Sequence, residues 1–130
     1  MNILSITSKN APEAQGPYSQ AVKGCNLLFL SGQLGLNPKS GKLVEGGFKE
    51  EAQQAFENLR EVLKAAGISF AEVVKFTVFV TDLSHYSELN DLLKEILNEK
   101  LYPARSVVQV AALPLNGQIE VEAIAVLKDA

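Results

Sequence analysis

The stretch that decides the fold is Ile119-Glu120-Val121-Glu122-Ala123-Ile124-Ala125-Val126-Leu127, near the end of the chain. Its side chains alternate as in a β-strand, and every odd-numbered residue is apolar. The other set begins with two glutamates and ends with Ile124 and Val126, so the predicted strand is partly apolar on both faces. The predicted strand from Val73 to Val80 has the same character, with one face expected to carry Val74, Phe76, Val78 and Val80.

Strands of this kind predict that one side of the sheet lies in an interface. The chain offers only two amphipathic helices, which suffice to cover one face of a sheet. A large exposed apolar face normally marks an interaction site. We therefore expect an obligate oligomer. The alternative is that the short N-terminal strands fold over the second face.

Helices and strands are predicted from the spacing of apolar residues. The first helix is expected over residues 48–66 with Gly67 as its C-cap. The second follows Ser84, its expected N-cap, carries Tyr86 in its apolar stripe, and ends before Pro103. Strands are expected at residues 2–6, 19–23, 26–31, 73–80, 105–112 and 119–127. The order β-β-β-α-β-α-β-β predicts a single α+β domain over residues 1–130, with one mixed sheet and both helices on one face.

Composition and charge narrow the classes of partner. The 130 residues include 12 Lys and Arg against 15 Asp and Glu, a formal net charge of −3 with no basic stripe, which argues against nucleic acid as the main partner. One cysteine, Cys25, and one histidine, His85, are too few for an intrachain disulfide or a Cys/His zinc site. Residues 1–7 do not resemble a signal peptide, and no apolar run has the length of a membrane span. We therefore expect a cytoplasmic protein with no membrane partner and no metal.

Arg105 is the first candidate for binding chemistry. It follows Pro103-Ala104 at the start of a predicted strand, where its planar guanidinium suits a carboxylate held by two parallel hydrogen bonds. The alternative is a structural salt bridge with Glu120 or Glu122. These glutamates share one face of an otherwise apolar strand, and burial of either would raise its pKa towards a range useful for handling a proton or positioning water. The alternative for them is simple solvation.

Four further positions are weaker candidates. Asn90, at the edge of the second helix's stripe, either braces the helix or lines a pocket, and Tyr18 either forms an aromatic pocket wall or packs. Ser31 and Gly32 end a predicted strand, where glycine lets a ligand approach the backbone closely; the alternative is an ordinary bulge. His85 has no visible partner in the sequence and is expected at the surface.

Together these segments resemble the RidA/YjgF family of reactive-intermediate deaminases. The resemblance runs from about residue 10 to residue 127 and rests on Asn10-Ala11-Pro12, Gly16-Pro17-Tyr18-Ser19-Gln20, Ser31-Gly32-Gln33, Val74-Lys75-Phe76-Thr77-Val78-Phe79-Val80 with Asp82-Leu83, Pro103-Ala104-Arg105-Ser106, Val110-Ala111 with Leu113-Pro114, and Ile119-Glu120-Val121-Glu122-Ala123-Ile124-Ala125. It implies a chorismate-mutase-like α+β fold and a homotrimer whose sheets meet around a barrel-like core, with clefts between subunits.

The resemblance also implies roles for individual residues. Arg105 would bind a substrate carboxylate, Glu120 would hold and help activate the attacking water, and the main-chain carbonyl of Val107 would contact that water or the substrate nitrogen. The pocket would be shaped by Tyr18, Ser31, Gly32 and Asn90. Many family members have a cysteine where this chain has Val107, so a main-chain role is kept here and a thiol is lost.

The implied reaction is hydrolysis of 2-imino and 2-enamino acids, such as 2-aminoacrylate, to 2-oxo acids and ammonia. It needs no metal or organic cofactor. Two other functions stay open. Some relatives are described as ribonucleases or translation inhibitors, and the same cleft would suit a carboxylate-binding or sensing trimer without turnover.

Overall fold

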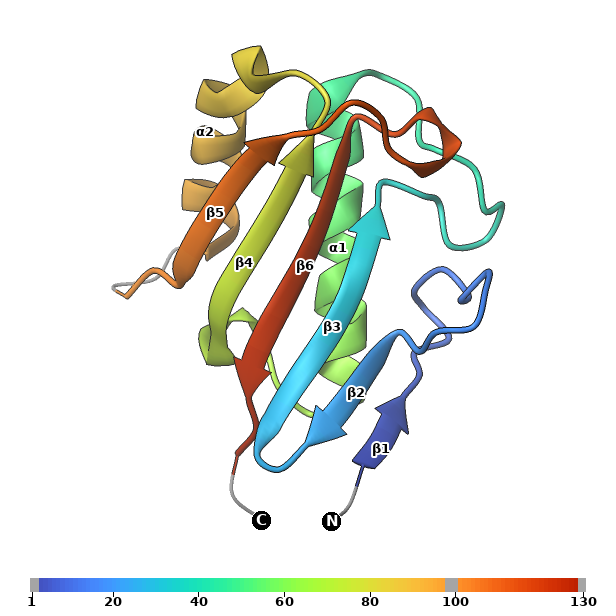
Figure 1. Ribbon diagram of the computed structural model, residues 1–130, viewed down its shortest axis with the longest axis vertical. Coiled ribbons are helices and arrows are strands. Elements are labelled where there is room, and N and C mark those ends of the chain that lie inside the picture. The colour runs from blue at the N-terminus through green and yellow to red at the C-terminus, as the bar shows by residue number, and fades with distance from the viewer. Residues whose placement is uncertain (1–2, 98–100, 129–130) are drawn as a thin grey trace.

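The computed structural model describes residues 3–97 and 101–128. A six-stranded sheet and two α-helices follow one another in the predicted order, which confirms the single α+β domain (Figure 1). The helices are α1 (Phe48–Ala65) and α2 (Tyr86–Leu97). The strands are β1 (Ile3–Ile6), β2 (Ala21–Gly24), β3 (Leu27–Leu34), β4 (Val73–Val80), β5 (Ala104–Gln109) and β6 (Ile119–Val126). The predicted first strand began at Asn2, which lies outside the described residues.

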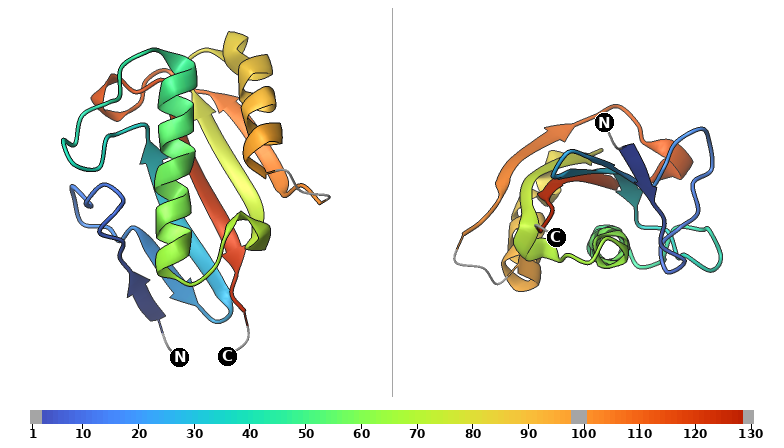
Figure 2. Two further views of the ribbon diagram at one scale, coloured as in Figure 1. Left: turned by 180° about the vertical axis from the view of Figure 1, so that it is seen from behind. Right: turned by 90° about the horizontal axis from the view of Figure 1, so that it is seen from below.

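The sheet is mixed, as predicted, with the strand order β1-β2-β3-β6-β4-β5. β5 runs parallel to β4, and the other neighbouring pairs are antiparallel. Both helices lie on the same side of the sheet (Figure 2). The core between the two layers includes side chains at most 1% exposed, among them Phe56, Leu59, Leu63, Phe76, Val78, Leu89 and Val121. Burial of each large apolar side chain contributes about 1.5–3 kcal/mol, so this layer is the main source of stability.

A buried amide also fixes α1 to the sheet. Asn58 is 1% exposed, and its Nδ2 donates to the carbonyls of Leu34 at 3.1 Å and Leu36 at 2.9 Å. Its Oδ1 accepts from Gln54 Nε2 at 2.9 Å, so the amide is fully engaged. Asn58 therefore holds the end of β3, the strand that carries Ser31 and Gly32.

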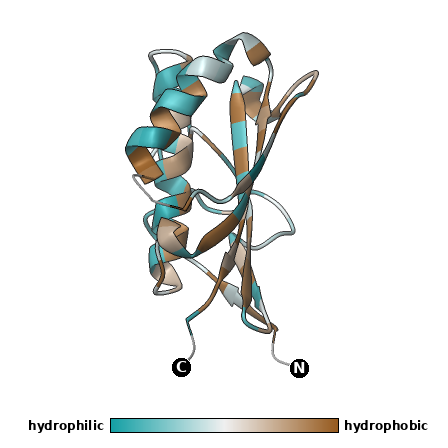
Figure 3. Cartoon of the chain, turned by 90° about the vertical axis from the view of Figure 1, so that its left-hand side faces the viewer, coloured by the Kyte–Doolittle hydropathy of each residue, from teal (hydrophilic) through white to brown (hydrophobic). Residues whose placement is uncertain are grey.

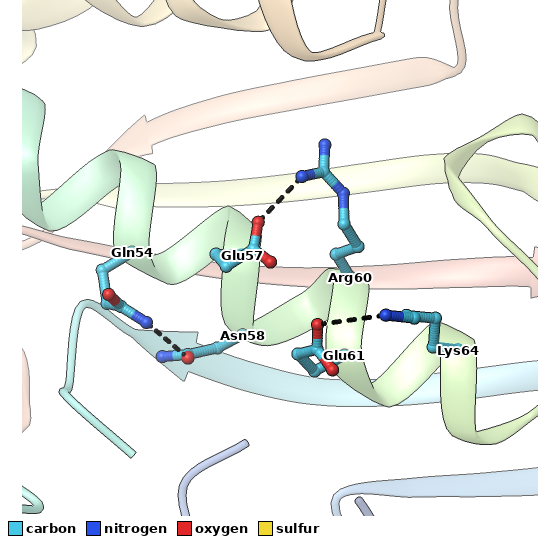
Figure 4. A network of polar contacts seen from close by, with 6 residues as sticks. All are labelled: Gln54, Glu57, Asn58, Arg60, Glu61 and Lys64. Carbon is cyan, nitrogen blue, oxygen red and sulfur yellow. Dashed lines mark hydrogen bonds and ion pairs between the residues drawn. The ribbon is translucent and has the colours of Figure 1, made fainter. Parts of the chain in front are cut away.

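The same helix also carries two ion pairs, Glu57–Arg60 and Glu61–Lys64 (Figure 4).

The helix ends partly follow the prediction. Gly67 has φ 79° just beyond α1, as expected of a glycine that ends a helix. The predicted N-cap of the second helix is wrong, because the Asp82 side chain accepts from the Ser84 N–H at 2.9 Å and a 3-10 turn, Leu83–His85, precedes α2. The helical segment thus begins before Ser84, which lies inside the turn. Tyr86 was expected on the buried stripe and is instead 45% exposed.

His85 has partners that the sequence did not reveal. Its Nδ1 lies 2.8 Å from Glu88 Oε1, and its ring stacks on Phe48 with centroids 4.3 Å apart. The histidine thus has partners on both α1 and α2. It contacts none of the candidate site residues through these interactions.

Two β-bulges change which residues share a face. In the β4–β6 pairing the register shifts between Val73 and Lys75, so Val73 is buried while Val74 is 45% exposed. Val74 was predicted on the same face as Phe76 and lies on the other, because a bulge inserts one extra residue into the alternation. A second register shift lies in β3 between Leu30 and Gln33. That strand continues to Leu34 rather than ending at Ser31, whereas β5 ends at Gln109, short of its predicted end.

The side of the sheet away from the helices is open and partly apolar. Its exposed residues include Phe29, Val74, Val108 and Val126, which are 36–46% exposed. β1 and β2 extend the sheet beside β3 rather than folding over this side, so the alternative with an N-terminal cover is wrong. Figure 3 shows the helices on one side only and apolar stretches along the strands. None of the helices in the described part of the chain is long and apolar enough to cross a bilayer.

Candidate functional site

Arg105 is held by two side chains of α2. Its Nη1 donates to Asn90 Oδ1 at 2.7 Å, and its Nη2 donates to the Tyr86 hydroxyl at 2.8 Å. The guanidinium carbon also lies 5.3 Å from the centroid of the Tyr86 ring, within the range of a cation–π contact. β5 places Arg105 beside Phe76 of β4, on the helix side of the sheet. The guanidinium is therefore oriented by neutral acceptors.

The alternative of a structural salt bridge is wrong for the described residues. Their ion pairs are Glu57–Arg60, Glu61–Lys64 and His85–Glu88, and none includes Arg105. Glu120 and Glu122 lie on the open side of β6, since Ile119 and Val121 face the helices. β4 separates β6 from β5 in the sheet. No carboxylate of the described residues thus occupies the guanidinium N–H groups of Arg105, which a carboxylate ligand would need as donors.

Glu120 lies against Gly32, across the β3–β6 pairing. A Cβ atom at Gly32 would lie 2.8 Å from Glu120 Cδ and 2.9 Å from its Cγ, so only glycine leaves room for this side chain. Partial burial raises the pKa of Glu120, and repulsion from Glu122 raises it further. Glu122 is exposed, as expected of a solvated glutamate. Of these two glutamates, Glu120 is therefore the one held partly buried against the bulge of β3.

Ser31, next to Gly32 in the bulge of β3, is hydrogen-bonded to the segment that carries Tyr18. Ser31 Oγ donates to the Ser19 carbonyl at 2.6 Å, and the Ser31 N–H donates to the Gln20 carbonyl at 2.9 Å. These bonds tie the bulge of β3 to the segment that carries Tyr18. Tyr18 is 53% exposed, and its hydroxyl accepts from the Gln15 N–H at 3.2 Å. Its ring is available to another molecule rather than packed in the core.

The predicted site residues therefore form two groups within one chain. The Arg105 group comprises the predicted residues Asn90, Arg105 and Val107 together with Tyr86, which was not predicted, on the helix side of the sheet edge. The Glu120 group comprises Tyr18, Ser31, Gly32 and Glu120, around the bulge of β3. Val107 shares the helix side of β5 with Arg105 and packs partly buried against the core. A single chain does not bring Arg105 and Glu120 together.

Sequence reasoning missed two members of this arrangement. Tyr86 was assigned to the core, although its position four residues before Asn90 puts both on one helix face and was a usable signal. Glu51, 5% exposed on α1, accepts from the Gln118 N–H at 2.9 Å and from Gln118 Nε2 at 2.7 Å. It thereby fixes the chain just before Glu120. Nothing in the sequence links Glu51 with Gln118.

Hollows lie near the helices in the described part of the chain. One of about 270 Å³ borders Asn90 and Arg105 and is otherwise mainly apolar, with walls that include Phe76, Leu93, Leu97, Tyr102 and Pro103. A hollow of about 320 Å³ lies between α1 and α2 and includes no residue of either group. Over residues 3–97 and 101–128, no cluster of three His, Cys, Asp or Glu side chains is arranged to hold a metal ion.

Comparison with known proteins decides the family. The family model described as Endoribonuclease L-PSP matches residues 8–127. A 2-iminobutanoate/2-iminopropanoate deaminase from Bos taurus is 51% identical over 121 residues, which cover 93% of this chain and 88% of the relative. The chain belongs to the RidA/YjgF family. The resemblance read from the sequence is thus confirmed.

Solved RidA/YjgF structures confirm the fold. RidA from an Antarctic Psychrobacter is 48% identical with a TM-score of 0.91, covering 95% of this chain and 99% of that one. E. coli TdcF with bound serine is 38% identical with a TM-score of 0.90, covering 96% of this chain and 99% of that one.

Proposed function

We propose that this protein is a hydrolytic deaminase of 2-imino and 2-enamino acids, such as 2-aminoacrylate. The observation that carries the proposal is the Arg105 guanidinium, oriented by Tyr86 and Asn90 and without an ion-pair partner among the described residues. Relatives about half identical over most of their length, named deaminases of 2-iminobutanoate and 2-iminopropanoate, support it. A cytoplasmic location stays a prediction.

The reaction requires mainly that the protein position the substrate and a water molecule. Arg105 fixes the substrate carboxylate, and Glu120 orients a water towards the imine carbon, which is already electrophilic. The water oxygen bonds to that carbon while Glu120 takes a proton from the water and gives it to the nitrogen, which forms a carbinolamine. Glu120 then moves the remaining hydroxyl proton to the amine as the carbon–nitrogen bond breaks and the carbon–oxygen double bond forms, so that imino acid and water become 2-oxo acid and ammonia. The Val107 carbonyl contacts the water or the substrate nitrogen. An enamine first gains a proton at carbon and becomes the imine.

The complete site is formed between subunits in this proposal. The Arg105 group and the Glu120 group lie on opposite sides of one sheet, so a substrate that touches both requires a second copy of the chain. The apolar open side, with Phe29, Val74 and Val108 exposed, supports burial against such copies. A homotrimer, with three sheets meeting around a barrel-like core, satisfies both requirements because each subunit offers one group to each neighbour.

A coupled assay tests the proposal. A threonine dehydratase releases 2-iminobutanoate, and the appearance of 2-oxobutanoate is followed with and without the purified protein. We expect wild type to accelerate this step and Arg105→Ala, of unchanged oligomeric state, to lose the acceleration by at least about a hundredfold, since the substrate loses its bidentate anchor. A folded wild type without acceleration contradicts the proposal and leaves a carboxylate sensor, which calorimetry with 2-oxobutanoate would reveal.

The description of the matching family model as an endoribonuclease keeps RNA as the second candidate. The net charge of −3 counts against it, because binding to phosphates relies on clustered cations. Cleavage of a labelled RNA by wild type, lost in Glu120→Gln but kept in the deaminase-inactive Arg105→Ala, would favour this candidate.

A further inference from the structure

Tyr86, the first residue of α2, contacts Arg105 in two ways. Its phenolic oxygen accepts from Arg105 Nη2 at 2.8 Å, and its ring lies under the guanidinium at 5.3 Å. Asn90 follows one helical turn later and accepts from Nη1 at 2.7 Å. Residues four apart lie on one helix face. A single face of α2 therefore holds both terminal nitrogens of the arginine.

The chemistry of these two acceptors leaves the cation ready for a ligand. A guanidinium has five N–H groups, and two bonds leave three of them for a carboxylate, which takes two in parallel. Tyr86 and Asn90 are neutral, so neither cancels the positive charge. An aspartate or glutamate in either place would orient the arginine equally well but would compete with an anionic substrate.

The two contacts of Tyr86 are not equivalent. The ring restrains the guanidinium through the cation–π contact, whereas the hydroxyl fixes the direction in which Nη2 donates. An unrestrained arginine has many rotamers, and ordering them opposes ligand binding. The hydroxyl of Tyr86 and the amide of Asn90 together remove that cost before the ligand arrives.

We infer that the Tyr86 hydroxyl is a positioning group that presets the Arg105 fork for the substrate carboxylate and so determines substrate affinity. This inference rests on the proposed function for its natural ligand. The hydroxyl affects binding of the carboxylate, and this binding stabilises the substrate complex and the transition state equally. Loss of the hydroxyl should therefore raise KM and leave kcat unchanged.

The test compares Tyr86→Phe with wild type in two measurements. The first is the dehydratase-coupled assay, and the second is calorimetric binding of 2-oxobutanoate, a stable carboxylate that needs no turnover. We expect KM and the dissociation constant of 2-oxobutanoate to rise together by about tenfold, the effect of one hydrogen bond to a charged group. Tyr102→Phe is the matched control, since Tyr102 borders the same hollow as Arg105 and has no hydrogen bond to it.

The outcomes separate the inference from the proposed function. An unchanged dissociation constant in Tyr86→Phe overturns the inference even where wild type is active, and so does a lower kcat with an unchanged KM. A wild type without turnover whose 2-oxobutanoate binding weakens in Tyr86→Phe overturns the proposed function and supports the inference. A wild type that neither turns over nor binds 2-oxobutanoate overturns both.

Discussion

The carboxyl group of Glu120 is partly buried beside Gly32, and Glu122 stands two residues along the same face of β6. Burial, and secondly repulsion from Glu122, raises the pKa of Glu120. In the proposed reaction the ionised carboxylate accepts a proton from water. Activity should therefore fall as the pH drops through this pKa, which gives kcat an acidic limb.

Glu122→Gln tests the smaller of the two causes. Removal of the neighbouring negative charge should lower the pKa of Glu120 and move the acidic limb of the kcat profile to lower pH, while kcat on the plateau stays unchanged. Glu45→Gln, an exposed loop substitution with the same change in net charge, should leave the limb in place. Equal displacement in both variants would mean that the limb reports net charge rather than Glu120.

The raised pKa also has a consequence for stability. Between the ordinary pKa of glutamate and the raised pKa of Glu120, the folded protein holds the Glu120 proton while the unfolded chain has lost it. The folded state then binds more protons, so this group's contribution to the free energy of unfolding decreases as pH rises through that window. Glu122→Gln should weaken that dependence, which denaturant titrations across the window would measure.

At the scale of elements, the β3 bulge decides where Glu120 lies. The register shift between Leu30 and Gln33 brings Gly32 next to Glu120 Cδ and Cγ. Buried bonds from α1 hold the surrounding chain, since Asn58 binds the carbonyls of Leu34 and Leu36. The position of the carboxyl group is thus set by how a helix and two strands dock, rather than by β6 alone.

Gly32→Ala should displace the Glu120 side chain without unfolding the protein. The added Cβ would lie 2.8 Å from Glu120 Cδ, and the end of a flexible side chain moves more readily than backbone. We expect kcat to fall about a hundredfold, as for a misplaced catalytic group, with a loss of stability of about 1–3 kcal/mol. Denaturant unfolding and the coupled assay measure the two effects.

Gly24→Ala in β2 is the matched control. Its Cβ would lie 3.8 Å from a Phe29 ring atom, an ordinary contact, so activity should stay near that of wild type. A fully active Gly32→Ala would show that Glu120 does not need its position over this glycine. An inactive Gly24→Ala would show that strand glycines in general are intolerant.

At the scale of the whole molecule, the sheet has one side covered by helices and one side open. The Arg105 group lies towards the helices at the β5 edge, and the Glu120 group lies on the open side. In the proposed function, such a chain carries two half-sites and no complete one. In our proposal, oligomerisation therefore completes the catalytic site and also buries apolar surface.

Mixed oligomers test this division directly. Arg105→Ala and Glu120→Gln should each be inactive alone. When the two variants are co-expressed in equal amounts, roughly a quarter of the interfaces should combine an intact Arg105 from one subunit with an intact Glu120 from its neighbour, and activity should return to that fraction of wild type. Native mass spectrometry would verify the hybrids and show whether they are trimers.

The control is a mixture of separately assembled variants that have not exchanged subunits, which should stay inactive. Verified hybrids without activity would contradict the division, because they would show that one chain supplies both residues to each site.

The sequence by itself determined the order of elements, the mixed sheet and the family, and it supplied the candidate site residues that remain predictions. These follow from local periodicity and from motifs such as Pro103-Ala104-Arg105-Ser106, which are properties of neighbouring residues. The two apolar faces of β6 were likewise readable, because alternation along a strand is local. The structure confirms that one of these faces is left open.

Only the tertiary structure decided which residues meet. The bulge that moves Val74 to the open side depends on pairing with β6, and the Asp82 cap depends on how the turn before α2 closes. The bonds from Tyr86 and Asn90 to Arg105 join α2 to β5, and Glu51 reaches Gln118 across 67 residues. Such contacts depend on docking between elements, and no pattern within either segment encodes them. For the same physical reason the separation of Arg105 from Glu120 became visible only once the sheet was assembled.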